Sequence, residues 1–357
     1  MFIIYLNTSS MDTELHNEVR KIQYTGRSTY ILSLPKKWIS ELQLKPGDSV
    51  TIARQINNSL SITPTLLNGI HTTEVIAYVK DKGKNTIKRK AISMYLRGFS
   101  IINFKTKGER IDPSQRDAIR EVVRRNLVGT EIIMDSSNII TIQVLLTVPE
   151  LSVNTAIRRM FLIGSSMHKD VMMALRENNR DLASDVIKSD DEVDRFGLYI
   201  LRNLFIASQN ERVLHEIGLK SPADCLSFSA IVKSLERIAD HATKIAQNVL
   251  QINDKLPDEI YSRIGEMSNL SLQLLNDAVE SFLRKNYYLA DSIVEKSEEI
   301  RRIESEIVSI IDKDVEANKF AGNIKLILEH LRRTAEHSFD IAESAMNQTV
   351  TEITEVL

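Results

Sequence analysis

Two pairs of acidic residues have a spacing suited to metal chemistry. Asp190 and Asp194 form one pair, and Glu236 and Asp240 form the other. Residues four apart share one face of a helix, so each pair presents two carboxylates side by side. Two such pairs facing each other repel unless protons or cations neutralise them, and oxygen donors from facing helices are how bundles hold metal ions. An acidic, solvated helix surface has the same spacing, so spacing alone leaves both interpretations open.

Histidines stand beside these carboxylates. His241 follows Asp240 directly, and His337 occupies the position that matches His241 in a repeat described below. An adjacent residue points about 100° away around a helix, so we predict structural hydrogen bonds for these histidines rather than metal ligation. His330 lies seven residues before His337 and shares its face, and we interpret both as surface or core histidines.

Motifs of common enzyme classes are missing from the sequence. There is no Walker-type phosphate loop, no G-x-S-x-G, no H-E-x-x-H and no C-x-x-C. The Glu-x-x-His pairs of ferritin-like di-iron enzymes are also absent from the candidate helices. We therefore predict no enzymatic activity and assign no catalytic residue.

Charge divides the chain into two parts. Residues 1–150 hold 21 Lys and Arg against 14 Asp and Glu, whereas the remainder holds 25 against 34. Such a split suggests a polyanion-binding end and a cation-binding end. Within residues 72–150, the cluster Lys88–Lys90 and the arginines of 116–125 lie on predicted helix faces, which we interpret as solvated surfaces.

Helices must position the acidic pairs, and the composition favours long helices. The 357 residues include only 7 prolines and 12 glycines, so turn-forming residues are scarce. From Thr155 onward the helical period dominates. Asp190 lies close to a predicted helix start at Leu182, where the helix dipole favours carboxylates.

The helical part contains an internal repeat. The segment 182–187 matches 289–294 at an offset of 107, and 235–242 matches 331–338 at an offset of 96. Each copy therefore holds three helices, and we predict two tandem three-helix bundles over residues 151–252 and 256–350. The predicted helices are 155–181, 182–217, 223–251, 257–287, 289–317 and 321–348.

The first part of the chain alternates between short strands and helices. Residues 18–66 contain alternating runs at 19–24 and 30–34, a short helix after Pro35, and a hairpin of 49–52 with 59–62. So short a segment cannot bury a core alone, so we predict that it dimerises. Residues 72–150 form an α+β insert, with strands at 74–79, 99–105, 131–134 and 139–146 and helices at 86–96 and 114–127.

Cellular location follows from cysteine usage and hydropathy. The single Cys225 cannot form an internal disulfide, which fits a reducing cytoplasm. No stretch approaches the roughly 18 apolar residues needed to span a bilayer, so we predict no membrane span. Residues 1–17 are expected to be a disordered leader.

The motifs resemble two known families. Glu236-Arg237-Ile238-Ala239-Asp240-His241-Ala242, together with the acidic run 190–194, resembles the PhoU family of phosphate-uptake regulators. The segment from Arg20-Lys21-Ile22 to Gly26, with 34–38 and Lys45-Pro46-Gly47-Asp48, resembles the AbrB-type swapped-hairpin domain. The resemblance, in this order and with an insert between, is to archaeal PhoU-type regulators. It implies a mainly α protein: tandem three-helix bundles preceded by a small β-rich swapped-hairpin domain and the α+β insert.

The family resemblance implies site residues. Some PhoU members hold iron or zinc clusters, and the matching positions are Asp190, Asp194, Glu236 and Asp240. The second repeat departs from this pattern, because Ser297 and Arg301 stand opposite Arg332 and Glu336. We therefore expect a metal ion in the first repeat only, with Arg301 and Arg332 supplying positive charge in the second. The swapped-hairpin resemblance implies DNA contacts by Arg20, Lys21, Arg27, Lys36, Lys37 and Arg54.

Two functions remain open. The first is a DNA-binding transcriptional regulator of phosphate uptake, which dimerises through its N-terminal domain. The second is a cytoplasmic adaptor that binds a phosphate ABC importer or a signalling partner, with the N-terminal domain serving only to dimerise.

Overall fold

The computed structural model describes residues 18–26, 28–54, 58–64, 73–79, 83–145, 152–313 and 318–354. The expected leader, residues 1–17, and the predicted DNA-contacting residue Arg27 lie outside the described residues. Contacts divide the chain into two units, Met1–His71 and Thr72–Leu357, and each is considered by itself.

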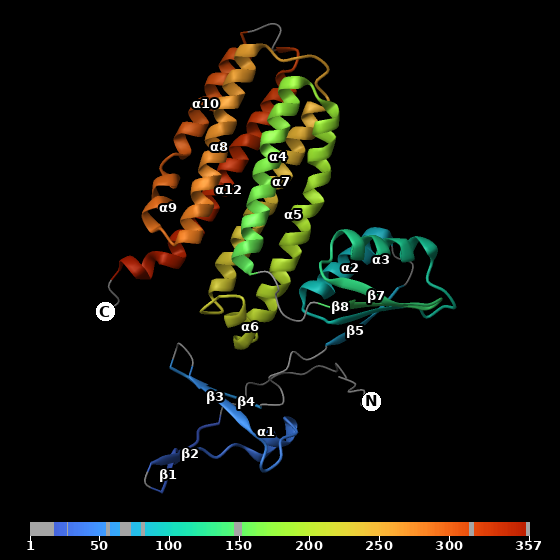
Figure 1. The fold of residues 1–357 in the computed structure, drawn as a ribbon, viewed down its shortest axis with the longest axis vertical. Helices are drawn as coiled ribbons and strands as arrows, with labels where there is room; N and C mark the ends of the chain where they lie inside the picture. Colours follow the sequence, from blue (N-terminus) through green and yellow to red (C-terminus); the bar gives the residue numbers. More distant parts are fainter. Residues whose placement is uncertain are drawn as a thin grey trace. The chain divides into compact units, whose positions relative to one another are not determined.

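The first unit consists of two hairpins and one short helix (Figure 1). Strands β1 (Gln23–Thr25) and β2 (Thr29–Ile31) pair antiparallel, with Tyr24 and Tyr30 in cross-strand contact. Helix α1 (Lys36–Glu41) follows Pro35, as predicted. Strands β3 (Val50–Arg54) and β4 (Leu60–Pro64) form the predicted second hairpin. The two hairpins are separate two-stranded sheets.

The described residues of this unit form no hydrophobic core within one chain. Among its described residues, only Pro35 and Pro64 are buried. The apolar side chains of both hairpins are exposed instead, and Tyr30 and Leu60 retain 70% and 68% of their surface. Two-stranded hairpins are marginal in water without further packing.

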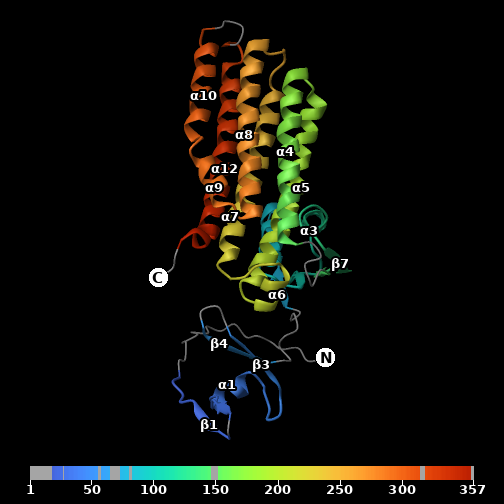
Figure 2. The same cartoon turned by 60° about the vertical axis from the view of Figure 1, so that its left-hand side comes forward.

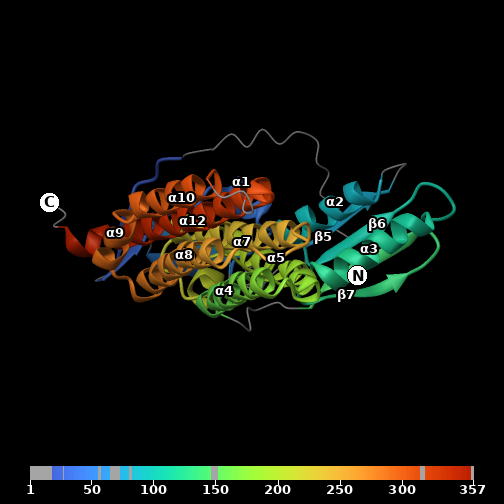
Figure 3. The ribbon, with the colours of Figure 1, turned by 90° about the horizontal axis from the view of Figure 1, so that it is seen from above.

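The α+β insert is a four-stranded sheet with two helices on one face (Figures 1 and 3). Its strand order is β5-β6-β8-β7, in which β5 and β6 are parallel and the other neighbours antiparallel. Buried side chains of the sheet, such as Phe104 and Ile142, share a core with buried residues of the helices. The elements are β5 (Glu74–Tyr78), α2 (Lys84–Leu96), β6 (Ile101–Lys105), α3 (Pro113–Arg125), β7 (Thr130–Asp135) and β8 (Ile139–Val144). All six match predicted elements to within two residues at either end.

Long helices make up the rest of the chain (Figure 2). The first repeat contains α4 (Val153–Glu177), α5 (Arg180–Ala207), α6 (Glu211–Glu216) and α7 (Asp224–Val249). The second contains α8 (Asp258–Arg284), α9 (Tyr287–Val294), α10 (Ser297–Ile311) and α12 (Ala321–Ile353). The mainly α fold class is confirmed. One continuous hydrophobic core joins both repeats, and α7 packs against α12 across their junction (Figure 3).

The repeat is visible in the turns. Asn178 and Lys285 both adopt left-handed backbone conformations at the ends of their helices. Each is followed by an asparagine whose side chain caps the next helix: Asn179 accepts from the Leu182 amide, and Asn286 accepts from the Leu289 amide. The residue in the left-handed conformation ends one helix, and the asparagine after it caps the next. Together they provide hydrogen bonds for free backbone groups at the end of the first helix and at the start of the second.

Two predicted helices are broken in the structure. The helix expected at 182–217 ends at Ala207, and Asn210 then caps α6 by accepting from two backbone amides. The helix expected at 289–317 is divided into α9 and α10 around Lys296. The predicted helix start at Leu182 is confirmed to within two residues, because α5 begins at Arg180, but Asp190 lies almost three turns after that start. The helix dipole therefore does not account for the carboxylate at that position.

The insert is fixed to the bundle through α5. Arg202 of α5 is 5% exposed, and its guanidinium donates to the carbonyl oxygens of Tyr95 and Gly98. Gly98 has φ of +87°, and a Cβ there would lie 3.1 Å from Cγ1 of Ile206. A glycine is required at this position both by the backbone conformation and by the close approach of α5.

Candidate functional site

The predicted acidic residues come together between α5 and α7. Asp190 and Asp194 lie on α5, and Glu236 and Asp240 lie on α7, which packs extensively against α5. Gly197, one turn from Val193 on α5, faces α7, because a Cβ built there would lie 4.0 Å from Oε2 of Glu236. The structure therefore places all four predicted metal-site residues at one helix–helix junction.

Burial and the charges of neighbouring carboxylates raise the pKa values of Asp190, Asp194 and Asp240. Burial, and then the charges of Asp194 and Asp240, raise the pKa of Asp190 to about 7. Burial, and then the charges of Glu236 and Asp240, raise the pKa of Asp194 to about 6. The pKa of Asp240 is also raised, chiefly by burial. Like charges in a half-buried site disfavour ionisation, so the group binds protons or cations more readily than isolated carboxylates do.

The four carboxylates are suitable ligands for a metal ion, but their side chains do not surround a metal position in this structure. Lys233 Nζ donates to Oε2 of Glu236 and so competes for one carboxylate. No three His, Cys, Asp or Glu side chains within the described ranges are arranged to hold a metal ion as they stand. Four carboxylates on facing helices fit a cation that prefers oxygen, but some of these side chains must turn to coordinate it.

The matching junction of the second repeat contains an arginine. Arg332 Nε lies 3.1 Å from Oε2 of Glu304 on α10, and its Nη1 contacts Oε1 of Glu336. A guanidinium thus lies between two carboxylates, as expected for Arg332. The expectation for Arg301 is wrong: this residue is exposed, and no ion pair to it is found in the described part of the chain. On α10 it is Glu304, three residues after Arg301, that lies at this junction and pairs with Arg332.

Histidines occupy the junction of α7 with α12. Nδ1 of His241 lies 3.2 Å from Nδ1 of His330, and the ring of His241 stacks on that of His337 at 5.4 Å. Nδ1 of His337 pairs with Oδ2 of Asp340. The prediction of structural hydrogen bonds for His241 and His337 is confirmed.

A further histidine was missed from the sequence. His168 on α4 is completely buried, and its Nε2 lies 3.1 Å from the Ile238 carbonyl oxygen, to which it donates. Burial lowers its pKa to about 4, so it is neutral. Its place among apolar residues such as Met167 and Val171 on one helical stripe was the available signal.

The predicted DNA-contacting residues of the first unit are exposed. Lys36 and Lys37 begin α1, Arg54 ends β3, and Arg20 and Lys21 precede β1. Arg20 pairs with Glu18, and the guanidinium of Arg54 donates to Asn58 at 2.6 Å. The distance between Lys37 and Glu41 is 4.0 Å, so this ion pair is loose.

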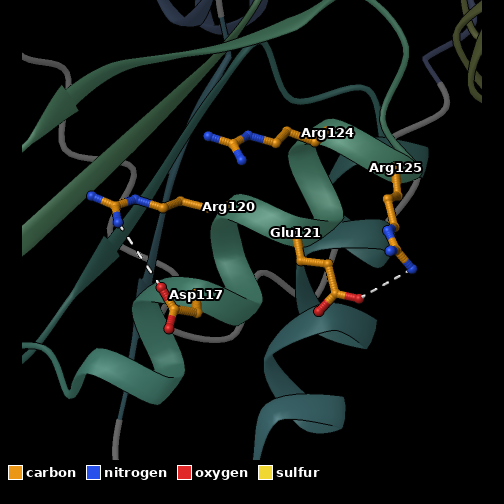
Figure 4. Close-up of a pocket in the computed structure, with 5 residues that line it drawn as sticks. All are labelled: Asp117, Arg120, Glu121, Arg124 and Arg125. Atoms are coloured by element: carbon orange, nitrogen blue, oxygen red, sulfur yellow. Dashed lines mark ion pairs between the residues drawn. The ribbon is translucent and has the colours of Figure 1, made fainter.

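Arginines of α3 form a second charged surface, which the sequence interpretation treated as solvated. Arg116 and Arg120 both pair with Asp135 of β7. The C-terminal half of α3 lines a cavity of about 400 Å³ (Figure 4). A second cavity, of about 640 Å³, lies between α3 and α5 and shares Arg124 and Arg125 with the first.

Comparison with known proteins agrees with the fold. Residues 157–249 and 264–345 match the PhoU domain, and residues 23–65 match the MazE family, described as antidote-toxin recognition MazE, bacterial antitoxin. The chain is therefore a PhoU-domain protein with two PhoU repeats. It carries in addition an N-terminal domain of the MazE and AbrB-like type.

Individual relatives match about half of the chain. A phosphate-specific transport system accessory protein PhoU homolog of Aquifex aeolicus is 28% identical over 169 residues, which cover 45% of this chain and 72% of the relative. The homolog of Clostridium acetobutylicum is 23% identical over 193 residues, covering 52% and 86%. The crystal structure of the phosphate transport system regulatory protein PhoU from Streptococcus pneumoniae covers 57% of this chain and 96% of that chain, with a TM-score of 0.48 and 23% identity.

No helix among the described residues is long and apolar enough to cross a membrane.

Proposed function

We propose that this protein is a DNA-binding transcriptional regulator of phosphate uptake, with a metal-binding PhoU-like helical part. Its relatives are named as accessory proteins of phosphate-specific transport systems, which supports a role in phosphate homeostasis. Those relatives align with about half of this chain, and the first unit is additional. The DNA-binding part of the proposal rests on that unit.

The observation that carries the proposal is the exposed apolar surface of the first unit. Ile22, Tyr24 and Ile52 retain 69%, 58% and 64% of their surface, although burial of such side chains normally contributes about 1.5–3 kcal/mol each. A second copy of the same hairpins offers the complementary surface. The unit therefore acts as a homodimer, in which each chain supplies apolar residues that the other covers.

Dimerisation doubles the positive charge available to DNA. Arg20, Lys21, Lys36, Lys37 and Arg54 are exposed in each chain, and Arg27 adds a further predicted contact. Lys and Arg contacts to phosphates release counterions and give an affinity that falls steeply with salt. These side chains position the protein on the backbone of DNA, whereas contacts to base edges decide the sequence.

The helical part holds the metal ion. Asp190, Asp194, Glu236 and Asp240 would provide oxygen ligands, with iron or zinc as the expected metals. When bound, the ion neutralises the mutual repulsion of these carboxylates. Because these carboxylates lie on α5 and α7, a bound ion would link the two helices, so that metal content and the packing of the first repeat would be coupled. No catalytic residue is assigned, and the protein is proposed to act in the cytoplasm.

A cytoplasmic adaptor is the second candidate, favoured by the accessory-protein names of the relatives. In that case the helical part would bind a phosphate ABC importer or a signalling protein, and the first unit would only dimerise.

Chromatin immunoprecipitation of the full chain from cells in high and low phosphate distinguishes the transcriptional regulator from the adaptor. A regulator is enriched at specific sites, and the Lys36→Glu, Lys37→Glu variant loses that enrichment while remaining dimeric. Absence of enrichment for the wild-type protein, with an unchanged cellular response in the variant, would leave only the adaptor.

A further inference from the structure

The cavity between α3 and α5 is lined by an excess of cations. Arg124 and Arg125 from the end of α3 face Lys188 and Arg195 of α5. These four side chains come from the insert and from the bundle, which belong to one compact unit. The sequence places the two groups more than sixty residues apart, so only the packing of α3 beside α5 brings them together.

Two of these cations have a carboxylate partner. Lys188 Nζ lies 2.8 Å from Asp185 on the same helix, and Arg125 lies 3.8 Å from Glu121 and 4.0 Å from Asp191. Lys188 is therefore paired before any ligand arrives, whereas the ion pairs of Arg125 are loose.

Arg124 and Arg195 have no such partner within the described residues. Figure 4 shows Arg120 paired with Asp117 and Arg125 paired with Glu121, whereas Arg124 extends without an ion pair. Arg195 is partly buried, and its Nε is a buried donor with no hydrogen-bond acceptor in the described structure. The Arg195 side chain nevertheless lines the cavity, and no carboxylate among the described residues compensates its charge, so an anion there would find a free guanidinium charge.

The lining also contains acids, and these limit what can bind. Asp185 and Asp191 are paired as described, while the exposed Glu192 has no ion pair among the described residues. A bound anion must therefore tolerate Glu192 nearby. A compact anion with several acceptor oxygens can engage two guanidinium groups while Glu192 remains turned toward solvent.

We propose that this α3–α5 cavity binds a phosphate group of a small molecule through Arg124 and Arg195. Guanidinium groups match the geometry of phosphate oxygens and form strong, charge-assisted hydrogen bonds with them. The cavity is open to solvent, so a phosphate group can approach both guanidinium groups whether it is free or part of a larger molecule. The site borders the acidic group, because Asp191 lines the cavity and its charge also raises the pKa of Asp190 and Asp194, but Arg195 points about 100° away from Asp194 around α5.

The test is calorimetric titration of the full chain, freed of metal by chelation, at low ionic strength. The probes are inorganic phosphate, AMP and adenosine. We expect one site per chain for phosphate, for AMP or for both, and no binding of adenosine. Binding of AMP alone identifies an organic phosphate as the ligand, and equal binding of both identifies the phosphate group itself.

Matched variants locate the site. Arg124→Ala and Arg195→Ala are each expected to weaken binding about tenfold or more, since each removes a charge-assisted hydrogen bond. Glu192→Gln is expected to strengthen binding, because it removes a repulsive charge. Arg180→Ala, on the same helix but outside the cavity, is expected to bind as the wild type does. Arg124 is exposed, so its substitution leaves the fold intact and keeps the test valid if Arg195→Ala unfolds.

Three results would overturn the proposal. One is the absence of binding for phosphate and AMP at millimolar concentration. Another is binding that Arg124→Ala and Arg195→Ala leave unchanged. The third is binding of duplex DNA alone, added as a further probe and weakened in Arg124→Ala, which would assign the cavity to a nucleic-acid surface and not to a small-molecule site.

Discussion

Replacing Arg332 with methionine tests the idea that this guanidinium stands where the first repeat would hold a cation. The change keeps an unbranched apolar stem and removes the charge, so that Glu304 loses Arg332 and Glu336 keeps only Arg333 as a partner. The free energy of unfolding should therefore fall at neutral pH.

The size of the effect follows from burial. Breaking a fully buried ion pair costs about 3–5 kcal/mol, whereas an exposed pair contributes about 0–1 kcal/mol. The side chains of Arg332, Glu304 and Glu336 retain 23%, 24% and 28% of their surface, so an intermediate cost of about 1–3 kcal/mol is expected. For a unit of this length, that loss lowers Tm by about 2–6 °C.

The assay is thermal unfolding followed by circular dichroism, at pH 7.5 and pH 4.5. An ion pair stabilises the fold only while its carboxylates are charged, so the Tm deficit of Arg332→Met should shrink at the lower pH. Arg333→Met is the matched control, because Arg333 also pairs with Glu336, at 3.0 Å, but keeps 49% of its surface. Its expected cost is below about 1 kcal/mol. Equal deficits for the two variants, or a deficit for Arg332→Met that is independent of pH, would refute the reasoning.

Three further predictions concern the proposed metal centre and DNA contacts. Asp194→Asn with Asp240→Asn should abolish bound iron or zinc in the purified protein, measured by elemental mass spectrometry. Lys36→Ala with Lys37→Ala should reduce the slope of log affinity for DNA against log salt by about 4 in a dimer, since each lost phosphate contact contributes about 0.9. In metal-free protein, the pKa of Asp190 is raised from 3.8 to about 7. Protonation of Asp190 therefore stabilises the fold below pH 4, and this contribution to the free energy of unfolding is lost as pH rises through 7. The substitution Asp190→Asn should flatten this part of the profile of stability against pH.

Controls for these predictions are available in the chain. Glu304→Gln alters the second repeat and should leave metal content unchanged. Lys90→Ala removes a lysine from the insert and should leave the salt slope unchanged. Metal retained by the double Asn variant, a salt slope unaffected by loss of Lys36 and Lys37, or an unchanged pH profile for Asp190→Asn would contradict the corresponding prediction.

Much of the fold could be predicted from periodicity. The elements of the insert and the long helices follow from alternation and helical spacing, which are local properties of the chain. The breaks near Ser208 and Lys296 could not be predicted, because neither proline nor glycine marks them. The four acidic residues were found because their spacing fixes a shared helix face, and the structure then placed both faces at one junction.

The sequence by itself determined the repeat, the helices, the division of charge and which carboxylates share a face. Only the tertiary structure decided which faces meet. It set Arg332 between Glu304 and Glu336, buried His168 against Ile238, and brought α3 beside α5 around Arg124 and Arg195. The physical reason is that helical periodicity assigns a side chain to a face through contacts a few residues apart. The partner of that face depends on the packing of helices that are distant in the chain, and no local pattern specifies it.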